Sequence, residues 1–268
     1  MKLAWSTDIH LNFLDGDARE NFYQHILKKN CDALLISGDI AEAPSTADLL
    51  QEMARQIKKP IYFVLGNHDY YRGNIHAVHQ QMRKITKEEE LLFWLPAAGA
   101  QALSKGVMLV GQDGWADGRL GDYVNSRVEL NDSHMIVDLL QERIVGKYQL
   151  LEKMRQLADV DAMQLKSDLL QVVNQHPKKI IVLTHVPPFK EACMHKGKKS
   201  DDDWLPYFSS KATGDVLMQV AKDNASIDFL VLCGHTHSEG HCQPLANLMV
   251  KVGKAEYCQP AVQEVVVV

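Results

Sequence analysis

Five short polar clusters, far apart along the chain, carry side chains that can bind metal ions or transfer protons. They are Asp8-Ile9-His10, Gly38-Asp39, Gly66-Asn67-His68-Asp69, Thr184-His185 and Gly234-His235-Thr236-His237. Each cluster follows a short apolar run that is typical of a β-strand. A packed core gives no reason to place ionisable groups repeatedly at strand ends, whereas a binding or catalytic site does. The pattern therefore indicates one shared site.

Asp8 and His10 are one residue apart. On an extended segment their side chains would point the same way, so both could reach one cation. A carboxylate oxygen together with an imidazole nitrogen suits Mn, Fe or Zn better than Ca or Mg. Taken alone, the pair is more simply explained as a strand-end carboxylate that caps backbone N–H groups beside a surface histidine.

The other clusters differ in how strongly each one, taken alone, indicates a metal site. Gly38-Asp39 is a common turn dipeptide, and His185 could be a plain loop residue. Gly66-Asn67-His68-Asp69 is more specific, because it offers an amide ligand and a titratable imidazole at the end of a buried strand. His235 and His237 form the strongest pair, since two alternate imidazoles directly after an apolar strand rarely serve packing.

Strands and helices are expected to alternate in the first part of the chain. The apolar patterns predict strands at 3–6, 33–37 and 61–65, and helices at 18–29 and 74–87. Ser45 or Thr46 is expected to cap a third helix that reaches about Lys58. This β-α-β-α-β-α order places helices over a largely parallel sheet.

A different pattern follows. We expect a hairpin at 101–111, a loop from Asp113 to Asp122, and a helical stretch from Asn131 to Asn174 with breaks at Gly146 and at 158–161. Further predictions are strands at 180–183, 229–232, 248–252 and 262–268, a helix at 211–222 and a polar loop at 190–206. No repeat or linker interrupts the chain, so one domain of residues 1–268 with a helical insert at about 131–175 is predicted.

Composition narrows the class of protein. The chain has 268 residues, of which 46% are hydrophobic and 24% charged, as in ordinary globular proteins. The net charge of −5 argues against a general nucleic-acid or membrane-surface binder. No apolar stretch approaches a membrane span, Asp8 comes too early for a signal peptide, and the five cysteines form no C-x-x-C pair. We therefore expect a soluble cytoplasmic enzyme.

In order, the clusters read D-x-H, G-D, G-N-H-D, H and G-H-x-H. This pattern resembles the calcineurin-like metallophosphoesterase superfamily, and every block is intact between Asp8 and His237. The resemblance implies an α/β fold: a four-layer α/β/β/α sandwich of two mixed sheets with outer helices. It also implies a metal-dependent phosphoesterase with two divalent or transition metal ions, for which Mn is the first expectation and Fe or Zn are alternatives.

The resemblance also implies a role for each motif residue. One metal would be held by Asp8, His10 and His237, the other by Asn67, His185 and His235, with Asp39 bridging the two. Such metals sit roughly 3.5–4 Å apart and share a water or hydroxide that attacks phosphorus in line. His68 matches the superfamily's non-ligand histidine, which would steady the developing charge and protonate the leaving oxygen. Asp69 either orients that imidazole or only forms the turn.

The sequence limits the class of substrate only in part. Gly38–Glu42 lacks the arginine-containing extension of serine/threonine protein phosphatases, and Asp69 stands where those enzymes have Glu, so protein phosphatase activity is disfavoured. A phosphomonoester or a small-molecule phosphodiester is the expected substrate. The alternatives are a nuclease and a non-catalytic binding or scaffold protein that retains the phosphoesterase core. Nucleic-acid and membrane partners are not expected.

Three arginines could clamp the phosphate oxygens of a substrate: Arg72, Arg119 and Arg127. A surface salt bridge is the simpler interpretation for each of them. Specificity is expected to lie in the segments that can rim the metals, namely 113–122, the helical stretch from Asn131, and 190–206.

Overall fold

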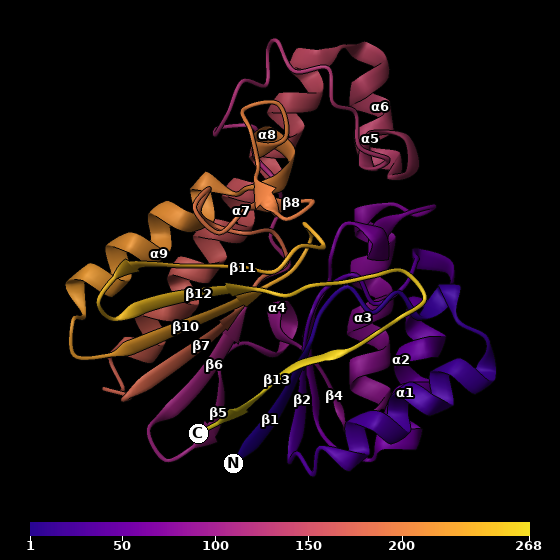
Figure 1. Ribbon diagram of the computed structural model, residues 1–268, viewed down its shortest axis with the longest axis vertical. Helices are drawn as coiled ribbons and strands as arrows, with labels where there is room; N and C mark the ends of the chain where they lie inside the picture. Colours follow the sequence, from indigo (N-terminus) through magenta and orange to yellow (C-terminus); the bar gives the residue numbers. More distant parts are fainter.

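Two mixed β-sheets pack face to face in the computed structural model, which describes residues 1–268 (Figure 1). The first sheet has the order β13 (Val262–Val267), β1 (Lys2–Ser6), β2 (Ala33–Ser37), β3 (Ile61–Val64) and β4 (Leu92–Trp94). The second has the order β11 (Gly240–Leu245), β12 (Leu248–Val252), β10 (Asp228–Cys233), β7 (Lys179–Leu183), β6 (Val107–Gly111) and β5 (Gln101–Ser104).

Nine helices lie between these strands in the chain: α1 (Gly16–Lys28), α2 (Ala43–Ile57), α3 (Ile75–Glu88), α4 (Leu95–Ala98), α5 (Asp132–Met135), α6 (Val137–Val145), α7 (Lys147–Val173), α8 (Leu205–Phe208) and α9 (Lys211–Asp223). Helices α1, α2 and α3 cover the outer face of the first sheet, and α7 and α9 cover that of the second (Figure 1). Short 3-10 helices span Leu11–Phe13 and His68–Tyr70, and β8 (Met194–His195) pairs with β9 (Lys198–Lys199) inside the predicted 190–206 loop.

Strand directions make both sheets mixed. In the first sheet β1 to β4 run parallel, and β13 is antiparallel to β1. In the second sheet β6, β7, β10 and β12 run parallel, while β5 and β11 are antiparallel edge strands. The predicted α/β/β/α sandwich of two mixed sheets with outer helices is therefore confirmed.

Three apolar layers hold the sandwich together. Alternate residues of a strand face opposite sides, so Leu35 of β2 lies between the sheets, whereas Leu34 and Ile36 face α1–α3. The layer between the sheets also contains Leu3, Val64, Leu109, Ile181, Leu183, Leu230 and Leu232. The third layer packs the second sheet against α7 and α9, through residues such as Leu169 and Leu217.

Leu35→Ala tests the layer between the sheets. Leu35 is fully buried, so its truncation should lower the free energy of unfolding by about 2–5 kcal/mol through lost burial and a residual cavity. The matched control is Leu170→Ala on α7, whose side chain is 45% exposed and whose loss should change stability by no more than about 0.5 kcal/mol. Urea unfolding followed by circular dichroism measures both. Equal effects in the two variants would contradict this account of the core.

Two local predictions about helices are wrong. Helix α2 begins at Ala43 with Glu42 as its N-cap residue, and the hydroxyls of Ser45 and Thr46 donate to the Glu42 carbonyl instead of capping. Helix α7 runs through 158–161 without a break, because Ala158 is buried in the core. The predicted break at Gly146 is confirmed, since its φ of 158° lies outside the helical region. Strands β4 and β11 were not predicted.

Helices α5 and α6 and the first half of α7 stand away from the two sheets (Figure 1). The second half of α7 belongs to the outer layer of the sandwich, where Leu165 and Leu169 pack against the second sheet. The helical insert at about 131–175 therefore contributes its last turns to the sandwich, and the single-domain organisation stays a prediction. None of the helices combines the length and apolarity that a bilayer span requires.

Candidate metal centre

The predicted site residues meet at one edge of the sandwich. Their clusters follow β1, β2, β3, β7 and β10, which are parallel to one another within each sheet. The carboxyl ends of parallel strands lie on the same side of a sheet, which is where open α/β sheets usually bind ligands. The two sheets present these ends to each other, so residues more than 200 positions apart come into contact.

Five of the proposed ligands have a left-handed backbone: Asp8 (φ 49°), His10 (φ 40°), Asp39 (φ 52°), His235 (φ 74°) and His237 (φ 54°). The prediction that Asp8 and His10 sit on an extended segment is wrong, because β1 ends at Ser6. Positive φ is uncommon for residues other than glycine and gathers at functional sites, where surrounding contacts offset its cost.

Asp8, His10, Asp39 and His237 form a group that can hold a metal ion, with their ligand atoms within 4.8 Å of one another. The Nε2 atoms of His10 and His237 are 3.2 Å apart, and His237 Nε2 lies 3.4 Å from Asp8 Oδ1. Burial lowers the pKa of His10 to about 4, against the opposing effect of Asp39. His10 is therefore neutral at pH 7, and a neutral imidazole is the form that binds metals.

Asn67, His185 and His235 form a second group. Asn67 Oδ1 lies 3.0 Å from His185 Nε2 and 2.9 Å from His235 Nδ1. The other nitrogen of each imidazole donates to a backbone carbonyl: His185 Nδ1 to Ser37 at 2.9 Å and His235 Nε2 to Tyr207 at 2.8 Å. The Tyr207 carbonyl sets the tautomer of His235, so the lone pair of His235 Nδ1 faces Asn67 Oδ1.

The orientation of the Asn67 amide is set from its other end. Asn67 Nδ2 donates to Asp132 Oδ1 at 2.7 Å and to the Tyr71 hydroxyl at 3.3 Å, and that hydroxyl donates to Asp132 at 2.6 Å. Only the oxygen of the amide can therefore face His235 Nδ1. Two acceptors held 2.9 Å apart repel each other unless a cation lies beside both, so this group fits a metal ion.

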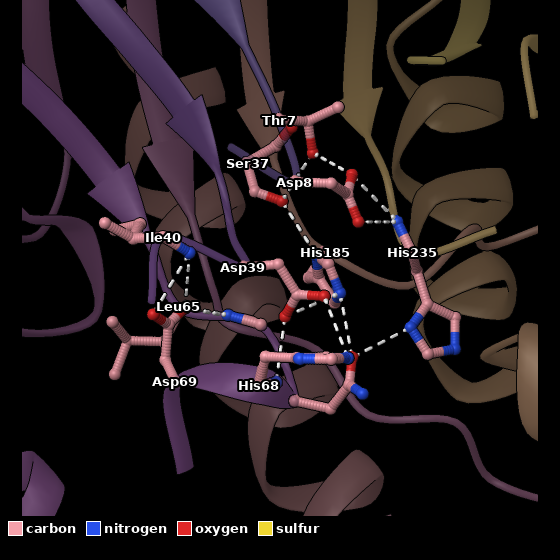
Figure 2. A network of polar contacts seen from close by, with 12 residues as sticks. Thr7, Asp8, Ser37, Asp39, Ile40, Leu65, His68, Asp69, His185 and His235 are labelled. Atoms are coloured by element: carbon pink, nitrogen blue, oxygen red, sulfur yellow. Dashed lines mark hydrogen bonds and ion pairs between the residues drawn. The ribbon is translucent and has the colours of Figure 1, made fainter. Parts of the chain in front are cut away.

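Asp39 lies between the two groups, as a bridging ligand would. Its Oδ2 is 3.8 Å from His10 Nε2. Its Oδ1 is 3.4 Å from His185 Nε2 and accepts the backbone N–H of His68 at 2.9 Å (Figure 2). Burial opposes the charged form of His185, but the Asp39 carboxylate outweighs it and raises the pKa of His185 to about 10. The position next to Asp39 thus favours a positive charge.

The backbone of the last cluster packs tightly on the first. The N–H of His235 donates to both carboxylate oxygens of Asp8, and the Thr7 hydroxyl donates to Asp8 Oδ2 at 2.7 Å (Figure 2). A Cβ atom on Gly234 would collide with the Asp8 carboxylate. Only glycine lets the strand end of the second sheet approach the first this closely.

His68 and Asp69 occupy different surroundings. His68 stacks on Tyr71 with ring centroids 4.1 Å apart and lies edge-on to His10 at 4.6 Å, and its buried Nδ1 has no hydrogen-bond partner. Asp69 accepts backbone N–H groups of Ile40, Ala41 and Gly66 (Figure 2), and no hydrogen bond joins it to His68. These contacts favour the turn-forming alternative for Asp69, and its catalytic role stays a prediction.

The three candidate arginines divide into paired and unpaired side chains. Arg72 forms an ion pair with Glu42 at 3.2 Å, and Arg119 pairs with Asp117 and Asp159. The simpler salt-bridge interpretation thus describes both. Arg127 is exposed and forms no ion pair. It lines a cavity whose other lining residues include Asp132, the partner of Asn67.

Several residues beside the ligands were missed by the sequence reasoning. Asp132 and Tyr71 orient Asn67, and Tyr257, from the loop before β13, lies 4.7 Å from the His10 ring and 5.0 Å from the His237 ring. Tyr71 directly follows the third cluster, and that proximity could have suggested it. Asp132 and Tyr257 carry no local signal, because the sequence around them resembles an ordinary helix start and an ordinary loop.

Asp132→Ala should weaken the second metal site selectively. The variant frees the Asn67 amide to rotate, and loss of such an outer-sphere partner typically costs about 10–100-fold in metal affinity. Asp132→Asn keeps an acceptor oxygen and should therefore recover part of the lost metal affinity. The matched control is Asp48→Ala on α2, an exposed carboxylate that belongs to neither ligand group. Competition with a fluorescent chelator measures the affinity of each of the two metal sites. Unchanged binding of both metals in Asp132→Ala would contradict the role of Asp132 in orienting Asn67.

Comparisons with known proteins show the family and the fold of this chain. A family model described as calcineurin-like phosphoesterase matches residues 1–239. A dimetal phosphatase from Danio rerio has a similar fold, with TM-score 0.59 and 11% identity over 95% of this chain and 87% of its own. A phosphopantetheinyl hydrolase from Mycobacterium tuberculosis gives TM-score 0.64 and 13% identity over 96% and 90%. No curated protein sequence matches. The family match covers most of the chain, which therefore belongs to the calcineurin-like phosphoesterase family.

Proposed function

We propose that this protein hydrolyses a phosphomonoester or a small-molecule phosphodiester with the help of two divalent metal ions. The observation that carries the proposal is the pair of acceptors His235 Nδ1 and Asn67 Oδ1, which lie 2.9 Å apart. The Tyr207 carbonyl fixes the tautomer of His235, and Asp132 fixes the orientation of the Asn67 amide. This arrangement is unfavourable without a cation. The adjoining group of Asp8, His10, Asp39 and His237 supplies a second cation site.

We assign the ligands as the superfamily pattern implies. Asp8, His10 and His237 would hold one ion and Asn67, His185 and His235 the other, with Asp39 shared. When bound, such a pair of ions supplies Lewis acidity and an activated water for in-line attack on phosphorus. Mn is the ion we expect, with Fe or Zn as alternatives.

His68 and Tyr71 contribute to the reaction without belonging to either ligand group. His68 approaches the site without belonging to either ligand group, with its Nε2 4.0 Å from Asp39 Oδ2. Its 13% exposed side chain can reach a bound substrate and donate a proton to the leaving oxygen. Tyr71 holds the His68 ring in place by stacking on it.

Metal analysis together with hydrolysis of an aryl phosphate and an aryl phosphodiester tests the proposal. The protein is treated with chelator and reloaded with Mn, Fe or Zn in separate samples. We expect turnover only in reloaded samples, and the ratio of the two rates distinguishes monoesterase from diesterase. A screen of phosphomonoesters, cyclic nucleotides, dinucleotides and phosphopantetheine then narrows the substrate. Absence of both metal binding and turnover would instead support the non-catalytic scaffold.

A further inference from the structure

A cavity of about 330 Å³ lies next to the second group of ligands and belongs to none of the five clusters. It is enclosed by the segment 115–130, by α5 and α6, and by the first half of α7. These are the elements that stand above the strand ends in Figure 1. The volume falls within the range of small-molecule pockets, about 300–1,000 Å³.

Two residues of the cavity wall contact the proposed ligands directly. Asp132 accepts the Asn67 amide at 2.7 Å, and the backbone carbonyl of Tyr207 accepts His235 Nε2 at 2.8 Å. Both Asp132 and Tyr207 line the cavity. The cavity is thus separated from the proposed ligands Asn67 and His235 by one residue.

The lining of the cavity is mainly apolar. Nine of its 16 lining residues are hydrophobic, among them Trp115, Tyr123, Leu150 and Met154. The ring of Tyr123 packs beside that of Tyr207, with centroids 5.6 Å apart. Aromatic walls bury large apolar area and favour flat partners.

The lining also contains three basic residues, Arg127, Arg143 and Lys147, beside the acidic Glu129 and Asp132. Lys147 Nζ lies 5.1 Å from the centre of the Tyr123 ring and donates to the carbonyls of Val124 and Ser126. Arg143 is paired with Glu129, whereas Arg127 has no ion-pair partner. A mainly apolar cavity whose lining includes an unpaired arginine suits an apolar group attached to an anion.

We propose that this cavity binds the alcohol half of the substrate, so that the enzyme selects phosphoesters of bulky apolar, preferably aromatic, alcohols. The inference rests on the proposed phosphoesterase function and adds the substrate class to it. The helical segment 131–160 then acts as the specificity element, because it supplies one wall of the cavity through Leu150 and Met154 and contacts the metal centre through Asp132.

Met154→Trp tests the proposal by filling the cavity. Met154 is 8% exposed and lines it. The probes are phenyl phosphate and 2-naphthyl phosphate, whose leaving groups have similar acidity but different size. We expect the wild type to favour 2-naphthyl phosphate through a lower KM, and Met154→Trp to raise that KM by about tenfold or more. The kcat/KM for phenyl phosphate should stay close to the wild-type value.

Met163→Trp is the matched control, since Met163 is on the same helix but 65% exposed and outside the cavity. It should keep the wild-type preference. Leu150→Trp, which fills the same cavity from one turn earlier, replaces Met154→Trp if that variant fails to fold. An unchanged ratio of the two kcat/KM values in a folded cavity-filling variant would overturn the proposal.

Calorimetric binding of 2-naphthol separates this proposal from the hydrolytic function. The alcohol needs no turnover, so it should bind the wild type and Met163→Trp but bind Met154→Trp at least about tenfold more weakly. Binding of 2-naphthol without hydrolysis of any phosphoester would support the cavity and contradict the phosphoesterase function. Hydrolysis without binding of 2-naphthol would support the phosphoesterase function and contradict the cavity.

Discussion

His68→Ala is expected to reduce turnover about 10²–10⁴-fold, the range for loss of a general acid, while the protein keeps both metals. The reason is positional. The His68 ring belongs to neither ligand group, yet it lies edge-on to His10 at 4.6 Å and its side chain is 13% exposed. It can therefore reach the leaving oxygen of a substrate without holding a metal ion.

The acidity of the leaving group sharpens this prediction. An aryl phosphate leaves readily without a proton, whereas an alkyl phosphate depends on one, so His68→Ala should harm alkyl phosphates more. Steady-state rates and metal analysis measure these effects. The matched control is His76→Ala on α3, an exposed imidazole whose hydrogen bond is to Gln80. Parallel loss of both metals in His68→Ala would show that His68 acts as a ligand.

Asp39→Asn is expected to lower the occupancy of both metals and to bring activity close to the uncatalysed rate. Asp39 faces His10 at 3.8 Å and His185 at 3.4 Å from separate carboxylate oxygens, so it serves both groups. The loss of affinity should exceed the about 10–100-fold that follows removal of an outer-sphere partner. The amide keeps the size of the side chain and removes only its charge.

Asp8→Asn gives the comparison, because Asp8 belongs to one ligand group alone and should reduce the occupancy of a single metal. Metal content per chain after dialysis measures both variants. The raised pKa of His185 should also fall in metal-free Asp39→Asn, since the Asp39 carboxylate is what raises it, and NMR titration of the imidazole reports the change. Full occupancy of either metal in Asp39→Asn would contradict a bridging role.

Much of the fold followed from local patterns. Apolar runs such as 33–37 and 61–65 predicted the strands because a strand buried on both faces needs apolar side chains at every position. Strands β4 and β11 were not predicted. Strand β4 has only three residues, and β11 is an edge strand whose apolar and polar residues do not alternate regularly from His241 to Leu245. The capping of α2 was wrong because Ser45 and Thr46 can also bond within the first turn.

The backbone of the site could not be read from the sequence. Asp8 and His10 were expected on an extended strand, but both have positive φ after β1 ends. Long-range contacts impose this conformation: the N–H of Asp8 donates to the Gly38 carbonyl and that of His10 to the Asp39 carbonyl. A local pattern of residue types contains no information about such partners.

The sequence by itself determined which proposed metal ligands this protein carries and in what order, because each of them follows a strand and the carboxyl ends of parallel strands meet at one edge. Only the tertiary structure decided how the ligands are oriented. The tautomer of His235 depends on the carbonyl of Tyr207, and the orientation of the Asn67 amide depends on Asp132, 65 residues away. A backbone carbonyl is the same group in every residue, and one aspartate at a helix start looks like any other. Their roles therefore arise only when folding brings them beside the metal centre and closes the cavity next to it.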